Sequence, residues 1–343
     1  MRRGLYIGGP IVPLTDLYPK GVMFVGRGRR RPDGIDPYEI DGTAFLVSLD
    51  NQAYAVTAAH VVSRKDVDYF VRVPLKGGGV KDLHVPKWWK NDQKLKDVAV
   101  APILLPDNQD MVASDPPHFA DDPSWADDKL FDGEGIDPQL GDIVYFIGLL
   151  QNVGAMVESN TPMVRAGTLG RLMQEDCPVV TPEKVVIYIT AHLIDCRSFG
   201  GFSGSPVYLQ QSRAGIVKRK DGSPGITTRY RTALFGMIGG HYDDYAAVEN
   251  TYGKSDHLTV PVNTGVGYVI PVEFIRETLM KEELIAMRTE AKEREAAERG
   301  RKNAGTMDAV SLSDEPSEFE RFEDLTRKLI NTPKPKPDEK ADQ

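Results

Sequence analysis

The chain has 343 residues, of which 41% are hydrophobic and 27% are charged, and its formal net charge is −8. Such a composition is ordinary for a globular protein with a large core, and the length fits one two-lobed domain or two domains. The acidic net charge argues against a general nucleic-acid binder. No stretch contains the ~18 consecutive apolar residues that a membrane-spanning helix needs.

The cysteine content and the N-terminus both bear on the cellular compartment. Only two cysteines occur, Cys177 and Cys196, which is fewer than a secreted disulfide scaffold carries. A reducing compartment is favoured, although a single bridge between these two cysteines stays open. Glycines and prolines interrupt the apolar run that follows Arg2 and Arg3, so a signal peptide is not expected. Together these features predict a cytoplasmic protein.

Residues from about 20 to 105 are expected to form a first β-barrel. The run TAFLVSL, a turn at Asp50-Asn51 and the run AYAVTAAHVV follow one another at the spacing of short paired strands. His60 ends the second of these runs, and Asp97 begins a further alternating run, DVAVAPI. Taken alone, such a histidine would more often be structural, and such an aspartate would more often cap a turn.

Residues 106–140 are expected to join two lobes as an acidic linker. The segment contains ten acidic residues against one lysine, and it also contains several prolines. Calcium binding needs carboxylates at fixed offsets around a glycine, and no such pattern stands out in the segment. We therefore expect a solvated linker, and we expect neither a metal ion nor a cofactor in the protein.

A second lobe is expected over about residues 141–271, and its most informative stretch is CRSFGGFSGSPVY at 196–208. Glycines on both sides of Ser203 allow a tight turn that brings backbone N–H groups close to a bound carbonyl oxygen. A serine is a weak nucleophile unless a neighbouring base takes its proton. Because Gly/Ser-rich segments are more often plain turns, Ser203 carries little weight without its partners.

His60 and Asp97 are the candidate partners of Ser203, and the order of the three residues along the chain supports this assignment. His60 ends one strand, Asp97 opens another, and Ser203 follows in its glycine-flanked turn, which is the chymotrypsin order of the serine-protease triad. The α/β-hydrolase motif does not fit, because it needs a glycine where Ser205 stands and a serine that precedes the histidine. The sequence therefore predicts a triad of the chymotrypsin order.

The segments GTAFLVSLDNQAYAVTAAHVV, DVAVAPI, GDIVYFIG and GFSGSPVY resemble those of trypsin-like (chymotrypsin-fold) serine peptidases. The nearest resemblance is to the bacterial branch that includes glutamyl endopeptidases and high-temperature-requirement proteases, and it covers about residues 40–270. It implies an all-β core of two six-stranded antiparallel β-barrels with C-terminal α-helices, and a protease domain over 1–275. It also implies a serine endopeptidase that works through an acyl-enzyme.

The resemblance implies a role for each site residue. Ser203 would attack the peptide carbonyl, His60 would take and return the proton, and Asp97 would orient the imidazole. The backbone N–H groups of Gly201 and Ser203 would form the oxyanion hole. The strand that pairs with the backbone of a protein or peptide substrate would contain Met237, Ile238, Gly239 and Gly240.

Two positions depart from the patterns of the family. Phe202 stands where zymogen-type trypsins carry the aspartate that pairs with a new N-terminus, so activation by N-terminal cleavage is not expected. By resemblance, Arg197 lies near the base of the primary specificity pocket, where an arginine would favour acidic substrate side chains. It could equally face solvent or pair with Asp195, and Ile238 stands where glutamyl endopeptidases place a histidine.

After Pro271 the composition becomes helical. Residues 276–302 are expected to form a charged helix, and 303–343 a linker, a short amphipathic helix at 316–332 and a disordered tail. The region 276–332 could dock a protein partner or remain a solvated terminal element. A second function therefore stays open, in which an idle or latent trypsin-like domain serves as a partner-binding module in a larger assembly.

Overall fold

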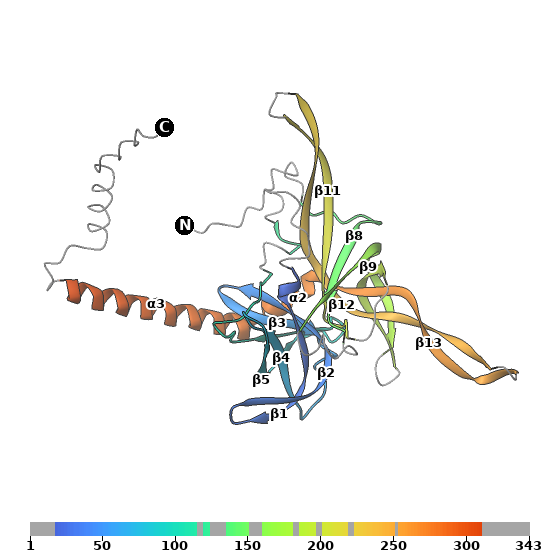
Figure 1. Ribbon diagram of the computed structural model, residues 1–343, viewed down its shortest axis with the longest axis horizontal. Coiled ribbons are helices and arrows are strands. Elements are labelled where there is room, and N and C mark those ends of the chain that lie inside the picture. The colour runs from blue at the N-terminus through green and yellow to red at the C-terminus, as the bar shows by residue number, and fades with distance from the viewer. Residues whose placement is uncertain are drawn as a thin grey trace, which may run out of the picture. The chain divides into compact units, whose positions relative to one another are not determined.

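The computed structural model describes residues 18–114, 119–123, 135–150, 160–180, 185–196, 201–218, 223–250 and 253–310. Within these ranges the chain is mostly β-strand, and its α-helices follow the last strand (Figure 1). It divides into two compact units, Met1–Ile285 and Ala286–Gln343, and the described β-strands all belong to the first unit.

The first sheet follows a short 3-10 turn, η1 (Tyr18–Gly21). Its strands are β1 (Val22–Arg31), β2 (Gly34–Leu49), β3 (Gln52–Ala58), β4 (Asp68–Pro74), β5 (Val80–Val85), β6 (Trp89–Lys90) and β7 (Val98–Pro102). They pair in the order β5-β4-β1-β2-β3-β7-β6. Between β2 and β3, Asp50 and Asn51 have φ angles of 56° and 64°, as a two-residue type I′ hairpin turn requires. The predicted turn at these two residues is confirmed.

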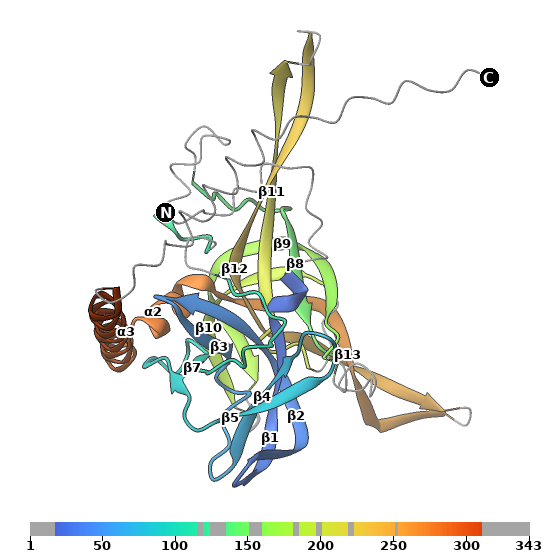
Figure 2. The same ribbon diagram turned by 60° about the vertical axis from the view of Figure 1, so that its left-hand side comes forward.

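The second sheet closes into a barrel. Its strands are β8 (Ile143–Gly148), β9 (Met163–Val180), β10 (Val186–Asp195), β11 (Pro206–Lys218), β12 (Pro224–Asn250) and β13 (Gly253–Pro271). They close in the order β10-β13-β12-β11-β8-β9. The hairpins β11–β12 and β12–β13 extend beyond the barrel in different directions (Figures 1 and 2). Cys177 and Cys196 in this part of the chain are both buried and free.

These two sheets confirm the expected all-β architecture with C-terminal helices. The barrel has the six antiparallel strands that were expected. The first sheet differs in two respects: it has seven strands rather than six, and these pair in an open order from β5 to β6, whereas the second sheet closes into a barrel. The additional member is β6, which contains two residues and pairs with the edge of β7.

The apolar core has two parts. The larger cluster joins both sheets and includes Phe45 and Val100 from the first sheet together with Tyr208 and Leu234 from the barrel. The smaller cluster fills the barrel and includes Phe202, the residue directly before Ser203. Removal of this apolar surface from water is the main driving force for folding, and it ties the serine segment to the barrel interior.

Two α-helices follow the barrel, α2 (Val272–Leu279) and α3 (Glu282–Val310). The expected boundary between 275 and 276 falls inside α2, because Ile275 and Leu279 on either side of it both pack into the core. The expected charged helix at 276–302 is accordingly shared between α2 and α3. The expected helix at 316–332 lies outside the described residues. No α-helix within the described ranges is long and apolar enough to cross a membrane.

Candidate active site

His60 and Asp97 lie side by side at one edge of the first sheet. Strands β3 and β7 are neighbours, and Ala58 at the end of β3 pairs with Val98 at the start of β7. The Asp97 carboxylate accepts a hydrogen bond from the backbone N–H of His60 at 2.9 Å, and its second oxygen lies 2.7 Å from His60 Nδ1. With Nδ1 held by Asp97, Nε2 is the ring nitrogen that remains to exchange a proton with a reactant.

The electrostatics of this pair follow from the contact. The side chain of His60 is 38% exposed and that of Asp97 is 19% exposed, so a reactant in solvent can reach the imidazole. Burial lowers the pKa of His60, but the charge of Asp97 and its hydrogen bond raise that pKa by more, so it lies above its ordinary value of 6.5. The imidazolium that forms on proton uptake is therefore stabilised by Asp97.

The serine turn is packed against the strand that leads to His60. A Cβ atom at Gly204 would lie 2.1 Å from the carbonyl oxygen of Thr43 and 2.4 Å from Thr57 Oγ1, and Gly204 has a φ of 85°. Only glycine fits such an approach in this conformation. The backbone N–H of Thr43 also donates to the carbonyl of Ser203 at 3.0 Å. Because Thr57 is three residues before His60, these contacts bring Ser203 to the same edge of the first sheet.

Thr43 is a residue of this region that the sequence did not single out. It is fully buried, and its Oγ1 donates to the carbonyl of Gly201 at 2.6 Å. The same oxygen accepts from the backbone N–H of Leu149 at 3.2 Å, and Thr57 Oγ1 donates to the Thr43 carbonyl at 2.7 Å. Thr43 thus joins β2 to the serine turn and to the segment after β8. Its place within the motif GTAFLV is the only sequence signal, and nothing there distinguishes it from its neighbours.

The hydroxyl of Ser203 donates to the carbonyl of Gly239 at 3.3 Å. Between the described residues no hydrogen bond joins this hydroxyl to His60. Such contacts are often absent without substrate and form in the complex. The N–H groups of Gly201 and Ser203 donate to none of the residues that the structure describes, and Gly201 has a φ of 98°.

The expected substrate-pairing segment is partly occupied by contacts within the protein. The N–H of Ile238 donates to the carbonyl of Ser205, and its carbonyl accepts from the N–H of Gly204, both at 2.8 Å. Met237 pairs with β11 on one side and β13 on the other. Residues 239–240 lie beyond the pairing with β11, although Gly240 pairs with Tyr268 on β13 and the Gly239 carbonyl accepts from the Ser203 hydroxyl.

Tyr268 on β13 lies directly behind this glycine pair. A Cβ atom at Gly239 would be 2.3 Å from Tyr268 Cε2, and one at Gly240 would be 2.7 Å from the Tyr268 hydroxyl. Both positions therefore need glycine, because a side chain at either one would displace the Tyr268 ring. Burial raises the pKa of Tyr268, and the charge of Asp97 raises it further. No local sequence pattern indicates this contact, because it depends on the register of β13 against β12.

Phe202 anchors the serine turn in the barrel. Its side chain is fully buried and its ring meets that of Phe146 edge-on, with centroids 5.6 Å apart. A Cβ atom at Gly148 would lie 2.3 Å from this ring, which shows how closely the strand passes it. The anchor is therefore apolar at the position where zymogen-type trypsins carry a charge. Arg197, expected at the base of the specificity pocket, lies outside the described residues.

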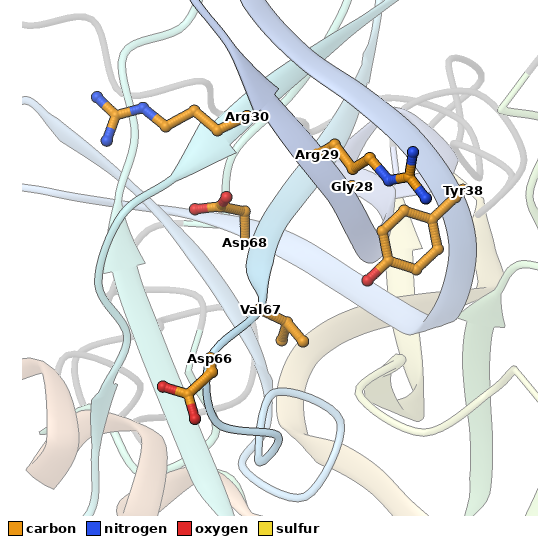
Figure 3. A pocket seen from close by; sticks show the side chains of 7 residues that line it. All are labelled: Gly28, Arg29, Arg30, Tyr38, Asp66, Val67 and Asp68. Carbon is orange, nitrogen blue, oxygen red and sulfur yellow. The ribbon is translucent and has the colours of Figure 1, made fainter.

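A separate pocket of about 380 Å³ lies between the β1–β2 hairpin and the loop that leads into β4 (Figure 3). Arg29 and Tyr38 lie together on one side of it, and Arg30 extends toward the other side. Asp66 and Asp68 also line it, so its charges favour neither anions nor cations. None of the expected site residues lines this pocket. Among the side chains that the structure describes, no group of three or more His, Cys, Asp or Glu could hold a metal ion.

No protein-family model matches the sequence, and no curated protein sequence matches it either. Solved structures with a similar fold include the Rv3671c protease of M. tuberculosis in its active form, with 15% identity and a TM-score of 0.41 over 77% of this chain and 81% of that one. Its inactive form has 15% identity and a TM-score of 0.38 over 77% and 89% of the two chains. The inactive form of a serine-to-alanine mutant has 15% identity and a TM-score of 0.37 over 77% and 86%. These values are too low to carry a conclusion about activity or substrate.

Proposed function

We propose that the protein is a serine endopeptidase that uses His60, Asp97 and Ser203. The observation that carries this proposal is the pair of contacts between His60 and the Asp97 carboxylate, at the edge on which the serine turn is packed. A carboxylate that holds Nδ1 fixes the tautomer whose Nε2 accepts a proton, and it stabilises the imidazolium that results.

The first half of the reaction forms an acyl-enzyme. The Ser203 hydroxyl leaves the Gly239 carbonyl, passes its proton to His60 Nε2, and its oxygen attacks the carbonyl carbon of the scissile peptide bond. The N–H groups of Gly201 and Ser203 donate to the oxygen that becomes negative. When the intermediate collapses, the C–N bond breaks and His60 gives its proton to the leaving amine.

The second half of the reaction releases the acyl group. Water loses a proton to His60 Nε2 and attacks the ester carbonyl, and the same backbone donors stabilise the second tetrahedral intermediate. The C–O bond to Ser203 then breaks, and the serine oxygen takes the proton back from His60. The products are two shorter peptides, and the enzyme returns to its starting protonation state.

Substrate selection is the finer part of the proposal. The backbone at 239–240, which has no partner on β11, would pair with the substrate on the acyl side of the scissile bond once Ser203 leaves the Gly239 carbonyl, a form of β-augmentation. Arg197 would favour an acidic side chain at the residue before that bond, as in glutamyl endopeptidases. The region 276–332 would bind a protein partner where one is needed.

The second candidate is a latent domain that binds a partner. One observation favours it, namely the Ser203 hydroxyl, which is bonded to Gly239 rather than to His60. A partner that changes the serine turn would then be required before Ser203 reacts.

The test is labelling with a fluorophosphonate probe, which reacts only with an activated serine. We expect wild-type protein and Ser205→Ala to be labelled, and Ser203→Ala and His60→Ala to be inert. Ser205 is the matched control because it lies two residues from the nucleophile and its side chain is fully buried. Labelling of Ser203→Ala would overturn the assignment, and a folded wild type that stays unlabelled would favour the latent domain.

The pH dependence of labelling sharpens this test. Only neutral His60 can take the serine proton, so the rate should fall as pH drops through the pKa of His60. Because Asp97 raises this pKa above 6.5, the half-maximal rate should lie above pH 6.5. A rate that stays constant down to pH 5 would contradict the assignment of His60 as the base.

A further inference from the structure

Asp97 follows a short turn, 91–96, that is closed by its own hydrogen bonds. The N–H of Asn91 donates to the carbonyl of Val98 at 3.0 Å, and the Asn91 side-chain oxygen accepts from the N–H of Gln93 at 3.0 Å. The N–H of Lys96 donates to the carbonyl of Gln93 at 2.9 Å. The position of Asp97 is therefore set by this turn together with the N–H of Ala59, which donates to the Asp97 carbonyl at 3.1 Å.

A buried hydrogen bond connects the turn to helix α2. The side-chain amide of Asn91 donates to Thr278 Oγ1 at 3.0 Å, although the two residues are 187 positions apart. Thr278 Oγ1 in turn donates to the carbonyl of Phe274 at 2.7 Å, so the hydroxyl acts as both an acceptor and a donor. Thr278 is fully buried and Asn91 is nearly so. A buried polar pair of this kind tolerates little displacement, because separation would leave each group without a partner.

A second contact joins α2 to the residue next to Asp97. Lys96 Nζ lies 2.5 Å from Glu277 Oε2 and 4.6 Å from the centre of the Phe274 ring. Asn91 and Lys96 thus both contact α2, the helix that packs on β7 and lies beside it in Figure 2.

Contacts within the turn and in the residues before it extend this attachment. Lys281 pairs with Asp92, and Glu283 accepts from Trp89 Nε1 at 2.5 Å and from Lys87 Nζ at 3.0 Å. The helical segment after the barrel therefore holds the whole stretch from β6 to Asp97.

We propose that helix α2 is a positioning element for Asp97, acting through the Asn91–Thr278 and Lys96–Glu277 contacts. The proposal rests on the proposed function, since it explains how the carboxylate of that triad is held against His60. A shift of the turn lengthens the contact between Asp97 and Nδ1, which weakens both the orientation of the imidazole and the stabilisation of its charged form. Any partner or truncation that displaces α2 therefore lowers the reactivity of Ser203 without touching it.

The test uses two pairs of matched variants. Thr278→Val removes the hydroxyl with little change of shape, and Thr278→Ser keeps it. Lys96→Met removes the charge that meets Glu277, and Lys94→Met removes a charge of the same sign from the exposed part of the same turn. The pKa of His60 is read from an NMR titration, which is tractable because the chain has only six histidines. The rate of fluorophosphonate labelling is measured beside it.

We expect Thr278→Val and Lys96→Met to lower the pKa of His60 toward its ordinary value and to slow labelling about fivefold, the scale of one buried hydrogen bond. Thr278→Ser and Lys94→Met should match the wild type in both measurements. An unchanged His60 pKa in folded Thr278→Val and Lys96→Met would overturn the proposal. So would an equal change in the two control variants.

The two measurements separate the failure of this proposal from that of the proposed function. A wild type that is not labelled speaks against an active peptidase, yet the NMR titration of His60 still decides whether α2 positions Asp97. Conversely, a labelled wild type with an unchanged His60 pKa in both variants would support the proposed peptidase function and contradict the positioning role of α2. If Thr278→Val does not fold, Lys96→Met and Lys94→Met decide the question alone.

Discussion

The two halves of the candidate site are held by different kinds of contact. Asp97 holds His60 through one ring nitrogen and one backbone N–H. Ser203 sits in a turn that is held by backbone hydrogen bonds, by the close packing of Gly204 and by the buried ring of Phe202. The first half depends on charge and the second on shape, so each should respond to a different class of substitution.

The largest expected effect comes from removing charge in the histidine half. Asp97→Asn keeps the size of the side chain but favours the wrong tautomer of His60, so we expect the labelling rate to fall on the order of 10⁴-fold while the fold is retained. The pKa of His60 should fall at the same time. Circular dichroism and labelling kinetics check these outcomes.

Asp68→Asn is the matched control for that substitution. Asp68 contacts His84 Nε2 at 3.1 Å, so it forms another Asp–His pair on the first sheet. Its substitution should leave labelling unchanged. Equal losses in both variants would mean that charge near the site matters less than general stability.

The second-largest expected effect comes from disturbing the close packing of the turn that carries Ser203. Gly204→Ala combines a φ of 85° with a Cβ only 2.1 Å from the Thr43 carbonyl, so we expect a loss of about 3 kcal/mol or more in unfolding free energy. Gly77→Ala has the same φ of 85° but nothing within 4 Å of its Cβ, so it should lose only about 1 kcal/mol. Urea unfolding measures both. Equal losses would show that backbone strain, and not packing on Thr43, holds the turn.

The smallest effect concerns a single buried hydroxyl in the serine half. Ser205 Oγ is buried and has no hydrogen-bond partner among the residues that the structure describes, so Ser205→Ala should raise the unfolding free energy by about 1 kcal/mol and leave labelling intact. Ser114→Ala is the control, because Ser114 Oγ is hydrogen-bonded to the Tyr208 hydroxyl at 3.0 Å, and its loss should be destabilising. Thermal unfolding of the two variants gives the comparison, and a destabilised Ser205→Ala would mean that the hydroxyl has a role in the turn.

The sequence predicted the strands and the turns better than it predicted the contacts between distant segments. The strand runs around His60 and Asp97 are local patterns, and because their strands are neighbours the two residues meet as the triad order predicted. The turn at Asp50-Asn51 is equally local. The catalytic roles of these residues remain predictions, since the geometry alone does not measure reactivity.

The rest of the site depends on distances that no local pattern encodes. Lys96 and Glu277 are 181 residues apart in the chain, and neither carries a motif. Tyr268 reaches Gly239 and Gly240 only because of the register of β13 against β12. The boundary expected at residue 275 fell inside α2 for the same reason, since composition marks where charge begins but not where apolar packing ends.

The buried ring of Phe202 has a consequence for the conditions under which the serine turn keeps its shape. An anchor formed by an ion pair weakens as dissolved salt screens its charges, whereas the contact between the rings of Phe202 and Phe146 has no charge to screen. Added salt therefore weakens the interaction between His60 and Asp97 more than it weakens the packing of the segment that carries Ser203. The turn that carries Ser203 should therefore keep its position across a wide range of ionic strength.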